Sequence, residues 1–366
     1  MSLSVGIVGL PNVGKSTLFN ALTRTQNAKA ENFPFCTIEP NTAVVPVPDP
    51  RLAVLADMVH PQNVIHATVE FVDIAGLVRG ASKGEGLGNK FLANIRDCDA
   101  ILEVVRCFEN EDITHVDGSI DPLRDVATIE NELILSDLEI VEARIGRISK
   151  VARSDPKLRP ELDALEALKD HLYAGNPART FAAIDDEVLK PALQESRLLS
   201  AKKVIYVANV DEAAIATGNS FTEALKDHAA KVGSECVRIC AAVEQDMSGL
   251  SDEERTEFLS SYGITESGLD LIIETAYRTL GLASFLTAGP KEVRAWTFHR
   301  GWKAPKCAGV IHSDFERGFI RARVVRYEDF VAHGGEQKCR ELALLREEGK
   351  EYEMQDGDMV EFLFSH

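Results

Sequence analysis

Lys15 and Ser16 are the residues whose types and spacing most directly indicate chemistry. They end the run Gly9-Leu10-Pro11-Asn12-Val13-Gly14-Lys15-Ser16, which matches the pattern G-x-x-x-x-G-K-[ST]. In this pattern backbone N–H groups of the loop surround phosphate oxygens, the lysine adds a full positive charge, and the hydroxyl binds Mg²⁺. The run therefore predicts a phosphate-binding loop. The residues expected to bind the nucleotide there are Asn12, Val13, Gly14, Lys15, Ser16 and Thr17.

The elements on either side of this loop are the ones that such a site requires. The apolar run Val5–Val8 precedes it and predicts a buried strand, and the helical stretch Thr17–Leu22 follows it. A strand, a glycine-bounded loop and a helix form an anion site because the start of the helix adds partial positive charge. The context therefore supports the motif.

Two later segments complete the predicted phosphate and metal site. The strand Thr68–Val72 ends at Asp73-Ile74-Ala75-Gly76, a D-x-x-G sequence. In P-loop switches the aspartate holds Mg²⁺, commonly through water, and the glycine amide faces the γ-phosphate. Thr37, in an irregular segment with two prolines, is the candidate for a second Mg²⁺ oxygen. We therefore expect Ser16, Thr37 and Asp73 as metal ligands.

Catalysis in this class depends on positioning and on electrostatic stabilisation of the transferred phosphoryl group, here from Lys15 and the Gly76 amide. The residue after Gly76 is Leu77, which cannot orient water, so slow turnover is expected. Three substitutes remain open: His115 could orient or deprotonate water, a K⁺ ion bound by Asn12 could add positive charge, or a partner could complete the site.

The purine specificity depends on Asn209-Val210-Asp211-Glu212, which follows the strand Val204–Ala208. A GTPase would present Asn-Lys-x-Asp there, with the aspartate accepting from N1–H and the 2-amino group of guanine. Here Val210 replaces the lysine and Glu212 the aspartate, so guanine specificity is in doubt and adenine becomes the better candidate. By position, Ala241 and Ala242 flank the base, so we expect Asn209, Val210, Glu212, Ala241 and Ala242 to form this side of the site.

Length and composition bound the rest of the interpretation. The chain has 366 residues, enough for two or three domains, and its net charge of −18 argues against general attraction to nucleic acid or anionic membranes. Seven scattered cysteines without a C-x-x-C pair indicate neither a zinc site nor a disulfide framework. No signal peptide or membrane-spanning run is evident, so we expect a cytoplasmic protein without membrane association, and a monomer.

The alternation of strands and helices is interrupted by a long helical region. Apolar residues recur at helical spacing from Val126 to Val151 and from Leu158 to Leu172, on either side of Ser154-Asp155-Pro156. Two helices around a proline turn predict an antiparallel hairpin inserted in the α/β domain. The expected domains are residues 1–121 and 199–281 for the two parts of the α/β domain, 122–198 for the hairpin, and 282–366 for a C-terminal, strand-rich domain.

Taken in order, GLPNVGKST, ENFPFCTIEPN, DIAGLVRGASKGEGLGNKF and NVDE resemble the YchF or Obg-like ATPase family of P-loop proteins, over the whole chain. The resemblance implies a P-loop G domain with a mostly parallel sheet and helices on both faces. It also implies an inserted coiled-coil hairpin and a C-terminal TGS domain of the ubiquitin-like β-grasp type. Preference for ATP over GTP and association with the ribosome follow from the same resemblance.

The C-terminal domain carries local positive charge in an acidic protein. The sequence from Lys291 to Arg326 contains nine Lys or Arg residues and three acidic residues. Cations mixed with tryptophan are typical of an RNA-facing surface, although a solvated strand face is the plain alternative. The candidate RNA-binding residues are Arg294, Lys303, Lys306, Arg321, Arg323 and Arg326.

Three functions are consistent with these features. The first is a slow ATPase switch whose triphosphate state changes how the hairpin and the C-terminal domain meet ribosome or RNA. The second is a nucleotide-gated binding adaptor in which hydrolysis is incidental, which Leu77 keeps open. The third is a GTPase of the Obg type, which predicts that GTP binds more tightly than ATP.

Overall fold

The computed structural model describes residues 3–28, 41–74, 87–113, 118–247 and 249–365. The chain forms two compact units. The first comprises Met1–Arg24, Glu39–Ala43 and Glu70–Ile272, and the second comprises Thr25–Ile38, Val44–Val69 and Ile273–His366. Thr37, Gly76 and His115 lie outside the described residues.

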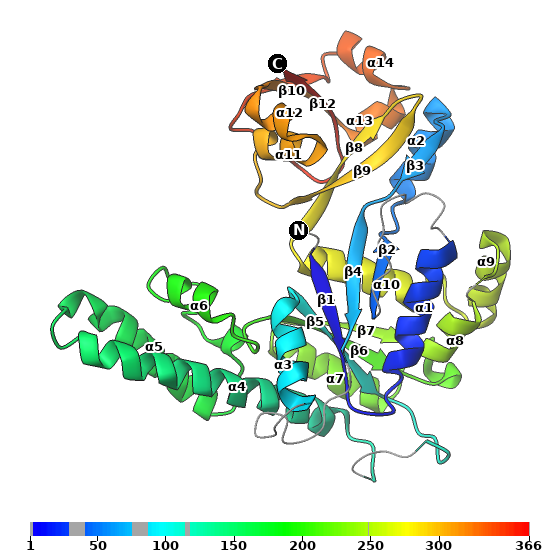
Figure 1. Cartoon of the computed structure of the whole chain (residues 1–366). Coiled ribbons are helices and arrows are strands. Elements are labelled where there is room, and N and C mark those ends of the chain that lie inside the picture. Colours follow the sequence, from blue (N-terminus) through cyan, green and yellow to red (C-terminus); the bar gives the residue numbers. More distant parts are fainter. Residues whose placement is uncertain (1–2, 29–40, 75–86, 114–117, 248, 366) are drawn as a thin grey trace. The chain divides into compact units, whose positions relative to one another are not determined.

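The first unit is built on a six-stranded sheet in the order β2-β4-β1-β5-β6-β7 (Figure 1). Strand β1 pairs in parallel with β4 and β5, and β5, β6 and β7 continue the parallel arrangement. Every residue of β5 is buried, including Glu103 and Arg106, as expected for a mostly apolar strand covered on both faces. The strands are β1 Ser4–Val8, β2 Thr42–Pro46, β4 Thr68–Asp73, β5 Ala100–Arg106, β6 Lys203–Asn209 and β7 Glu235–Ile239.

Helices lie on both faces of this sheet, which confirms the predicted α/β fold class (Figure 1). Apart from the inserted hairpin and the last two helices, they follow strands, as parallel connections require. The α-helices are α1 Lys15–Ala28, α3 Leu87–Asp97, α7 Ser220–Lys231, α8 Ala241–Asp246, α9 Asp252–Ser261 and α10 Gly268–Thr279, and a 3₁₀ turn, η4, spans Glu212–Ala214.

A helical hairpin follows β5, as the sequence predicted. Asp121 caps its first helix by accepting a hydrogen bond from Arg124 N at 3.1 Å, and Pro122 occupies the first helical turn. The hairpin helices pack through buried Leu165, Leu168 and Leu172. The elements of the insertion are α4 Pro122–Val151, η2 Pro156–Leu158, α5 Arg159–Tyr173, η3 Ala178–Thr180 and α6 Lys190–Ser196.

A buried carboxylate fixes the point where the chain returns from the hairpin to the sheet. Asp137 of α4 accepts from Leu199 N at 2.8 Å, from Ser200 N at 2.7 Å and from Ser200 Oγ at 2.6 Å. Burial raises the pKa of Asp137 to about 6, although these three hydrogen bonds oppose the shift. Nearby, Arg179 donates to Glu130, which joins η3 to α4.

The second unit contains a mixed sheet in the order β11-β10-β12-β8-β9-β3. Strands β8 and β9 form an antiparallel hairpin, and β12 lies between β8 and β10, parallel to the first and antiparallel to the second. Helix α11 packs on one face through Ala304, Cys307 and Ala308. This β-grasp arrangement is the predicted one. Its elements are β8 Leu282–Ala288, β9 Glu292–His299, α11 Ala304–Ile311, α12 Ser313–Arg317, β10 Phe319–Arg326, α13 Tyr327–Ala332, α14 Glu336–Glu341, β11 Arg346–Glu348 and β12 Asp358–Phe364.

The two compact units differ from the predicted domains at several places: residues 25–28 and 273–281, expected in the G domain, belong to the second unit, and a longer segment does so as well. Residues 44–69, expected in the first part of the G domain, group with the C-terminal residues. The segment contains α2 Pro50–Val59 and β3 Asn63–Ile65, and β3 pairs in parallel with β9 as the sixth strand of the second sheet. Because backbone pairing of this kind joins residues more than 200 positions apart, local sequence patterns could not indicate it.

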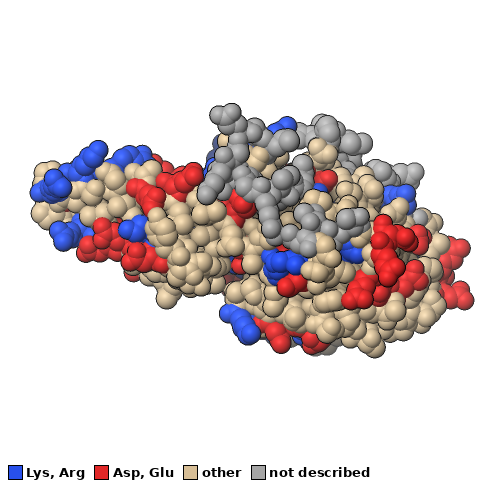
Figure 2. Space-filling view, turned by 90° about the horizontal axis from the view of Figure 1, so that it is seen from below, with Lys and Arg blue, Asp and Glu red and all other residues tan. Residues whose placement is uncertain are grey.

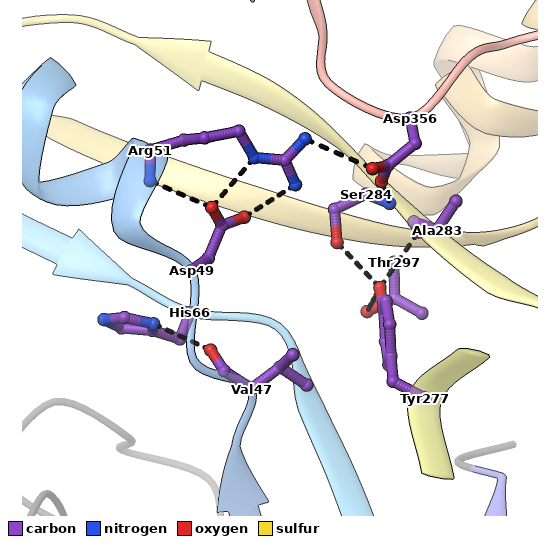
Figure 3. A network of polar contacts seen from close by, with 9 residues as sticks. All are labelled: Val47, Asp49, Arg51, His66, Tyr277, Ala283, Ser284, Thr297 and Asp356. Carbon is purple, nitrogen blue, oxygen red and sulfur yellow. Dashed lines mark hydrogen bonds and ion pairs between the residues drawn. The ribbon is translucent and has the colours of Figure 1, made fainter. Parts of the chain in front are cut away.

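A polar network holds this segment in the second unit (Figure 3). Arg51 donates to Asp49 at 2.8 Å and to Asp356 at 3.2 Å. Asp356 in turn accepts from Ser284 N at 2.9 Å, and the Tyr277 hydroxyl lies 2.7 Å from Ser284 Oγ. The start of α2 is therefore bound to the residues that precede β12 and to β8.

Within the described ranges, no helix combines the length and the apolar character needed to cross a membrane.

Candidate nucleotide-binding site

The phosphate loop connects β1 to α1 through two residues with left-handed backbone. Asn12 has φ 63° and Gly14 has φ 97°. At Gly14 a side chain is excluded twice, because the backbone is in the region that favours glycine and because a Cβ atom would lie 2.2 Å from Asn209 Nδ2. The second glycine of the motif is therefore required by the close approach of another strand.

Asn209, at the end of β6, ties three segments of the site together. Its Nδ2 donates to Val13 O at 2.8 Å, and its Oδ1 accepts from Ala241 N at 3.0 Å. The side chain is buried, with 4% exposed. An aspartate could not make the first of these bonds, so the amide positions the phosphate loop against the start of α8.

Lys15 and Asp73 meet at the phosphate end of the site. Lys15 Nζ lies 3.5 Å from Asp73 Oδ1, and their side chains are 11% and 21% exposed. Ser16 is the second residue of α1, directly after Lys15. A hydroxyl and a carboxylate are hard oxygen donors of the kind that Mg²⁺ prefers beside phosphates, so the described part of the predicted ligand set fits that ion.

A cavity of about 470 Å³ adjoins the loop. Its lining includes eight of the eleven predicted nucleotide-binding residues, and Val13, Lys15 and Ser16 are not among them. The lining residues are Asn12, Gly14, Thr17, Phe108, Asn110, Ile113, Asn209, Val210, Asp211, Glu212, Cys240, Ala241 and Ala242.

Five lining residues were missed by the sequence analysis. Asp211 and Cys240 lie between predicted ones, and Phe108, Asn110 and Ile113 form a further wall. The signal for this wall was available: the three residues closely follow β5, and ligands of open α/β sheets bind outside the carboxyl ends of neighbouring strands.

The side of the cavity expected to face the base is partly apolar. Val210 is 2% exposed, and its N–H donates to Ile239 O at 2.8 Å. Glu212 is exposed, and its Oε2 accepts from the Tyr262 hydroxyl at 3.2 Å. Burial raises the pKa of the Cys240 thiol, which therefore stays protonated at neutral pH.

This loop, with the parallel sheet behind it, defines a P-loop nucleotide-binding protein. Residues 4–136 match a family described as 50S ribosome-binding GTPase, and residues 282–365 match the family YchF-GTPase_C, described as a protein of unknown function.

Relatives cover the whole chain. It is 50% identical to the ribosome-binding ATPase YchF of Bacillus subtilis and 52% identical to that of Haemophilus influenzae, over 100% of each chain. A solved structure of the Schizosaccharomyces pombe YchF GTPase is 35% identical over 99% of this chain and 98% of that one, with a TM-score of 0.89. The chain belongs to the YchF family.

The six candidate RNA-binding residues lie in the second unit in three different settings. On the sheet, Arg321 pairs with Glu347 at 2.8 Å and Arg323 with Glu361 at 2.9 Å. Lys303 pairs with Glu351, and Arg326 is exposed. The Arg294 guanidinium lies 3.8 Å from the centre of the Trp296 ring, and Lys306 Nζ lies 4.0 Å from that of Trp302.

Proposed function

We propose that this protein is a slow, Mg²⁺-dependent ATPase that associates with the ribosome according to its nucleotide state. The observation that carries the adenine preference is the pair at the base-recognition positions. Val210 is buried and has no long side chain to pack along a base as a lysine would. Glu212 accepts a hydrogen bond from the Tyr262 hydroxyl. The guanine contacts of an Asn-Lys-x-Asp motif are therefore lost, and adenine needs neither of them.

The chain's own residues supply the binding of the triphosphate. Lys15 would leave its ion pair with Asp73 to contact phosphate oxygens, and Asp73 would then be available to the metal. Ser16, Thr37 and Asp73 would hold Mg²⁺, which neutralises developing charge on the phosphoryl oxygens, and Gly76 would add an amide donor. Because Leu77 cannot orient water, turnover without a partner is slow.

Three groups are candidates for activating the attacking water. His115 is a titratable residue in a segment that follows the cavity wall, and Asn12 lines the cavity, where it could bind a K⁺ ion. A ribosomal partner is the third. We retain His115 as the first candidate because it can both orient water and accept its proton.

Association with the ribosome is supported by the names of the relatives, two of which are ribosome-binding ATPases at 50% and 52% identity over the full length. The protein then acts in the cytoplasm as a monomer, beside ribosomes. Two basic surfaces are available for RNA phosphates: the C-terminal residues described above and the free end of the hairpin.

We assign the larger contribution to the hairpin end. The sequence from Arg144 to Arg159 holds six Lys or Arg residues and one acidic residue, Asp155. In the structure Arg144 also pairs with Glu161 and Glu195, and Arg159 pairs with Asp163. Lys and Arg side chains gather at this end of the molecule in Figure 2. Five of the six side chains are exposed, namely Arg147, Lys150, Arg153, Lys157 and Arg159. Positive charge of this density binds RNA phosphates without sequence preference.

The first experiment is a calorimetric titration of the protein with Mg²⁺-ATP and Mg²⁺-GTP, alone and with ribosomes. ATP is expected to bind at least about tenfold more tightly, which corresponds to about 1.4 kcal/mol. The double variant Val210→Lys/Glu212→Asp restores the guanine motif and should shift the preference towards GTP. Tighter binding of GTP by the unaltered protein would support a GTPase of the Obg type instead.

The second experiment separates a switch from an adaptor. His115→Ala is assayed for ATP turnover and for ATP affinity, with and without ribosomes. A fall in turnover at unchanged affinity supports the ATPase, with His115 in the catalytic step. If ribosome binding and release follow ATP and ADP normally while His115→Ala leaves turnover unchanged, the protein is a nucleotide-gated adaptor. Lys15→Ala is the control that should lose nucleotide binding altogether.

A further inference from the structure

One wall of the nucleotide cavity depends on a single buried side chain. Phe108, Asn110 and Ile113 line the cavity. The carbonyl oxygens of the same three residues accept hydrogen bonds from Arg106, the last residue of β5. Arg106 Nε donates to Phe108 O at 3.2 Å, Nη2 donates to Asn110 O at 3.0 Å, and Nη1 donates to Ile113 O at 2.9 Å.

The loop has few other attachments in the described part of the chain. At its start, Cys107 N donates to Asn209 O at 2.8 Å, and Cys107 O accepts from Asn219 Nδ2 at 2.7 Å. Beyond Cys107, the other hydrogen bonds that residues 108–113 make with described residues are internal, from Asp112 N to Asn110 Oδ1 and from Ile113 N to Asn110 O. Arg106 is therefore the group that fixes the outer part of the loop to the sheet.

Burying the charged guanidinium of Arg106 at this position costs free energy. Only 1% of it is exposed, and burial lowers the pKa of the guanidinium, an effect that Asp125 opposes. Its carbon Cζ lies 4.7 Å from the centre of the Phe108 ring, so the cation also holds that ring. An apolar side chain would fill the same space but would leave three carbonyl groups without donors. The planar fork of arginine is what allows three carbonyls to be bound at once.

We propose that Arg106 is a positioning residue for purine recognition: it holds Phe108, Asn110 and Ile113 against the base, while the phosphate loop grips the triphosphate independently. This inference deepens the proposed function, on which it rests, and concerns the purine-binding half of the cavity alone. It predicts that a change at Arg106 weakens binding of the purine but leaves binding of the triphosphate nearly unchanged.

The test is Arg106→Lys, titrated with Mg²⁺-ATP, Mg²⁺-GTP and Mg²⁺-tripolyphosphate, which has no base. Lysine keeps the charge but cannot reach three carbonyls. ATP affinity should fall at least about tenfold and the preference for ATP over GTP should shrink, while tripolyphosphate affinity should change less than about twofold. The matched control is Arg238→Lys, because Arg238 also donates to loop carbonyls, Ile215 O at 2.9 Å and Ala216 O at 2.7 Å, outside the cavity lining.

Unchanged ATP affinity in Arg106→Lys, or an equal loss for ATP and tripolyphosphate, would overturn the inference. So would an equal loss of ATP affinity in the Arg238 variant. If the unaltered protein does not prefer ATP, the proposed adenine specificity fails, whereas the contrast between ATP and tripolyphosphate still decides the role of Arg106.

Hydrogen exchange on the unaltered protein provides a second measurement that does not depend on the variant folding. ATP should protect the amides of residues 108–113, and tripolyphosphate should not. Equal protection by the two ligands, or none by ATP, would contradict a wall that faces the base.

Discussion

The free end of the helical hairpin and the β10–β12 face of the second unit both collect basic residues in an acidic protein, but they differ in what surrounds the charge. On the β-sheet, Arg323 lies directly opposite Glu361, and both Arg321 and Arg323 are within 4 Å of Glu347. At the hairpin end, Arg144 pairs with Glu161 and Glu195, and Arg159 pairs with Asp163. Three other cations there, Lys150, Arg153 and Lys157, are exposed and make no ion pair with any residue in the described ranges. A count of charges along the chain gives the same result for both surfaces. In the structure, carboxylates on neighbouring strands offset the charge of the sheet arginines.

The comparison matters because attraction to RNA depends on net surface charge. Each phosphate contact releases counterions, and an arginine already paired with a carboxylate releases fewer. Exposed ion pairs on a sheet also contribute little stability, typically below about 1 kcal/mol. The sheet arginines are therefore expected to act mainly in local pairing, and the hairpin end to act in RNA binding.

The largest expected effect is at the hairpin. Lys150→Glu/Lys157→Glu should weaken ribosome association about a hundredfold at low salt and reduce the salt slope, because two phosphate contacts become repulsive. Co-sedimentation and fluorescence anisotropy over a range of salt concentrations measure both quantities. The control Lys226→Glu/Lys231→Glu changes net charge equally on α7 and should have little effect. Equal losses of ribosome affinity in the two variants would mean that net charge, and not the hairpin end, determines binding.

The next effect concerns the root of the hairpin. The pKa of Asp137 is raised to about 6 in the folded protein, against about 4 in an unfolded chain, so the carboxyl binds its proton more tightly when folded. Its contribution to stability is complete below pH 4 and is lost as the pH rises through 6, by roughly 2 to 3 kcal/mol. Thermal unfolding of Asp137→Asn should lack this decline. Identical pH profiles for the two proteins would contradict the assignment.

A smaller gain is expected when the sheet arginines are released. Glu347→Gln/Glu361→Gln removes the two carboxylates that face Arg321 and Arg323, so RNA affinity should rise about threefold and the salt slope should steepen. Anisotropy with a single-stranded RNA at several salt concentrations measures this. No change would mean that even free arginines on this face do not meet RNA.

The smallest effect is expected for the sheet arginines themselves. Arg321→Ala/Arg323→Ala should lower ribosome affinity less than about threefold, because their charge is already offset. A loss as large as that of the hairpin variant would reverse the comparison and would favour the C-terminal residues as the main RNA contact.

Much of the fold was predictable because its signals are local. The strand before the phosphate loop, the glycines of the loop and the mostly apolar run of β5 are each visible within a few residues. The hairpin was predictable for the same reason, since its apolar spacing and the Asp155-Pro156 turn lie on one continuous stretch. The phosphate loop and most of the cavity lining followed from these elements.

Other features required the tertiary structure. The grouping of β3 with the second unit depends on pairing with β9, far along the chain. That the three carbonyl groups of the cavity wall share one donor, Arg106, depends on how the loop folds back over the end of β5. The pairing of Arg323 with Glu361 depends on the register of β10 against β12. None of these is encoded by spacing within one segment.

The sequence alone therefore determined the class of ligand, because gripping a triphosphate needs only a short loop, one lysine and one hydroxyl in fixed order. The tertiary structure decided which side chains face the purine and which basic residues keep their charge unpaired. The physical reason is that backbone geometry is set by neighbours in the chain, whereas burial and charge pairing are set by neighbours in space.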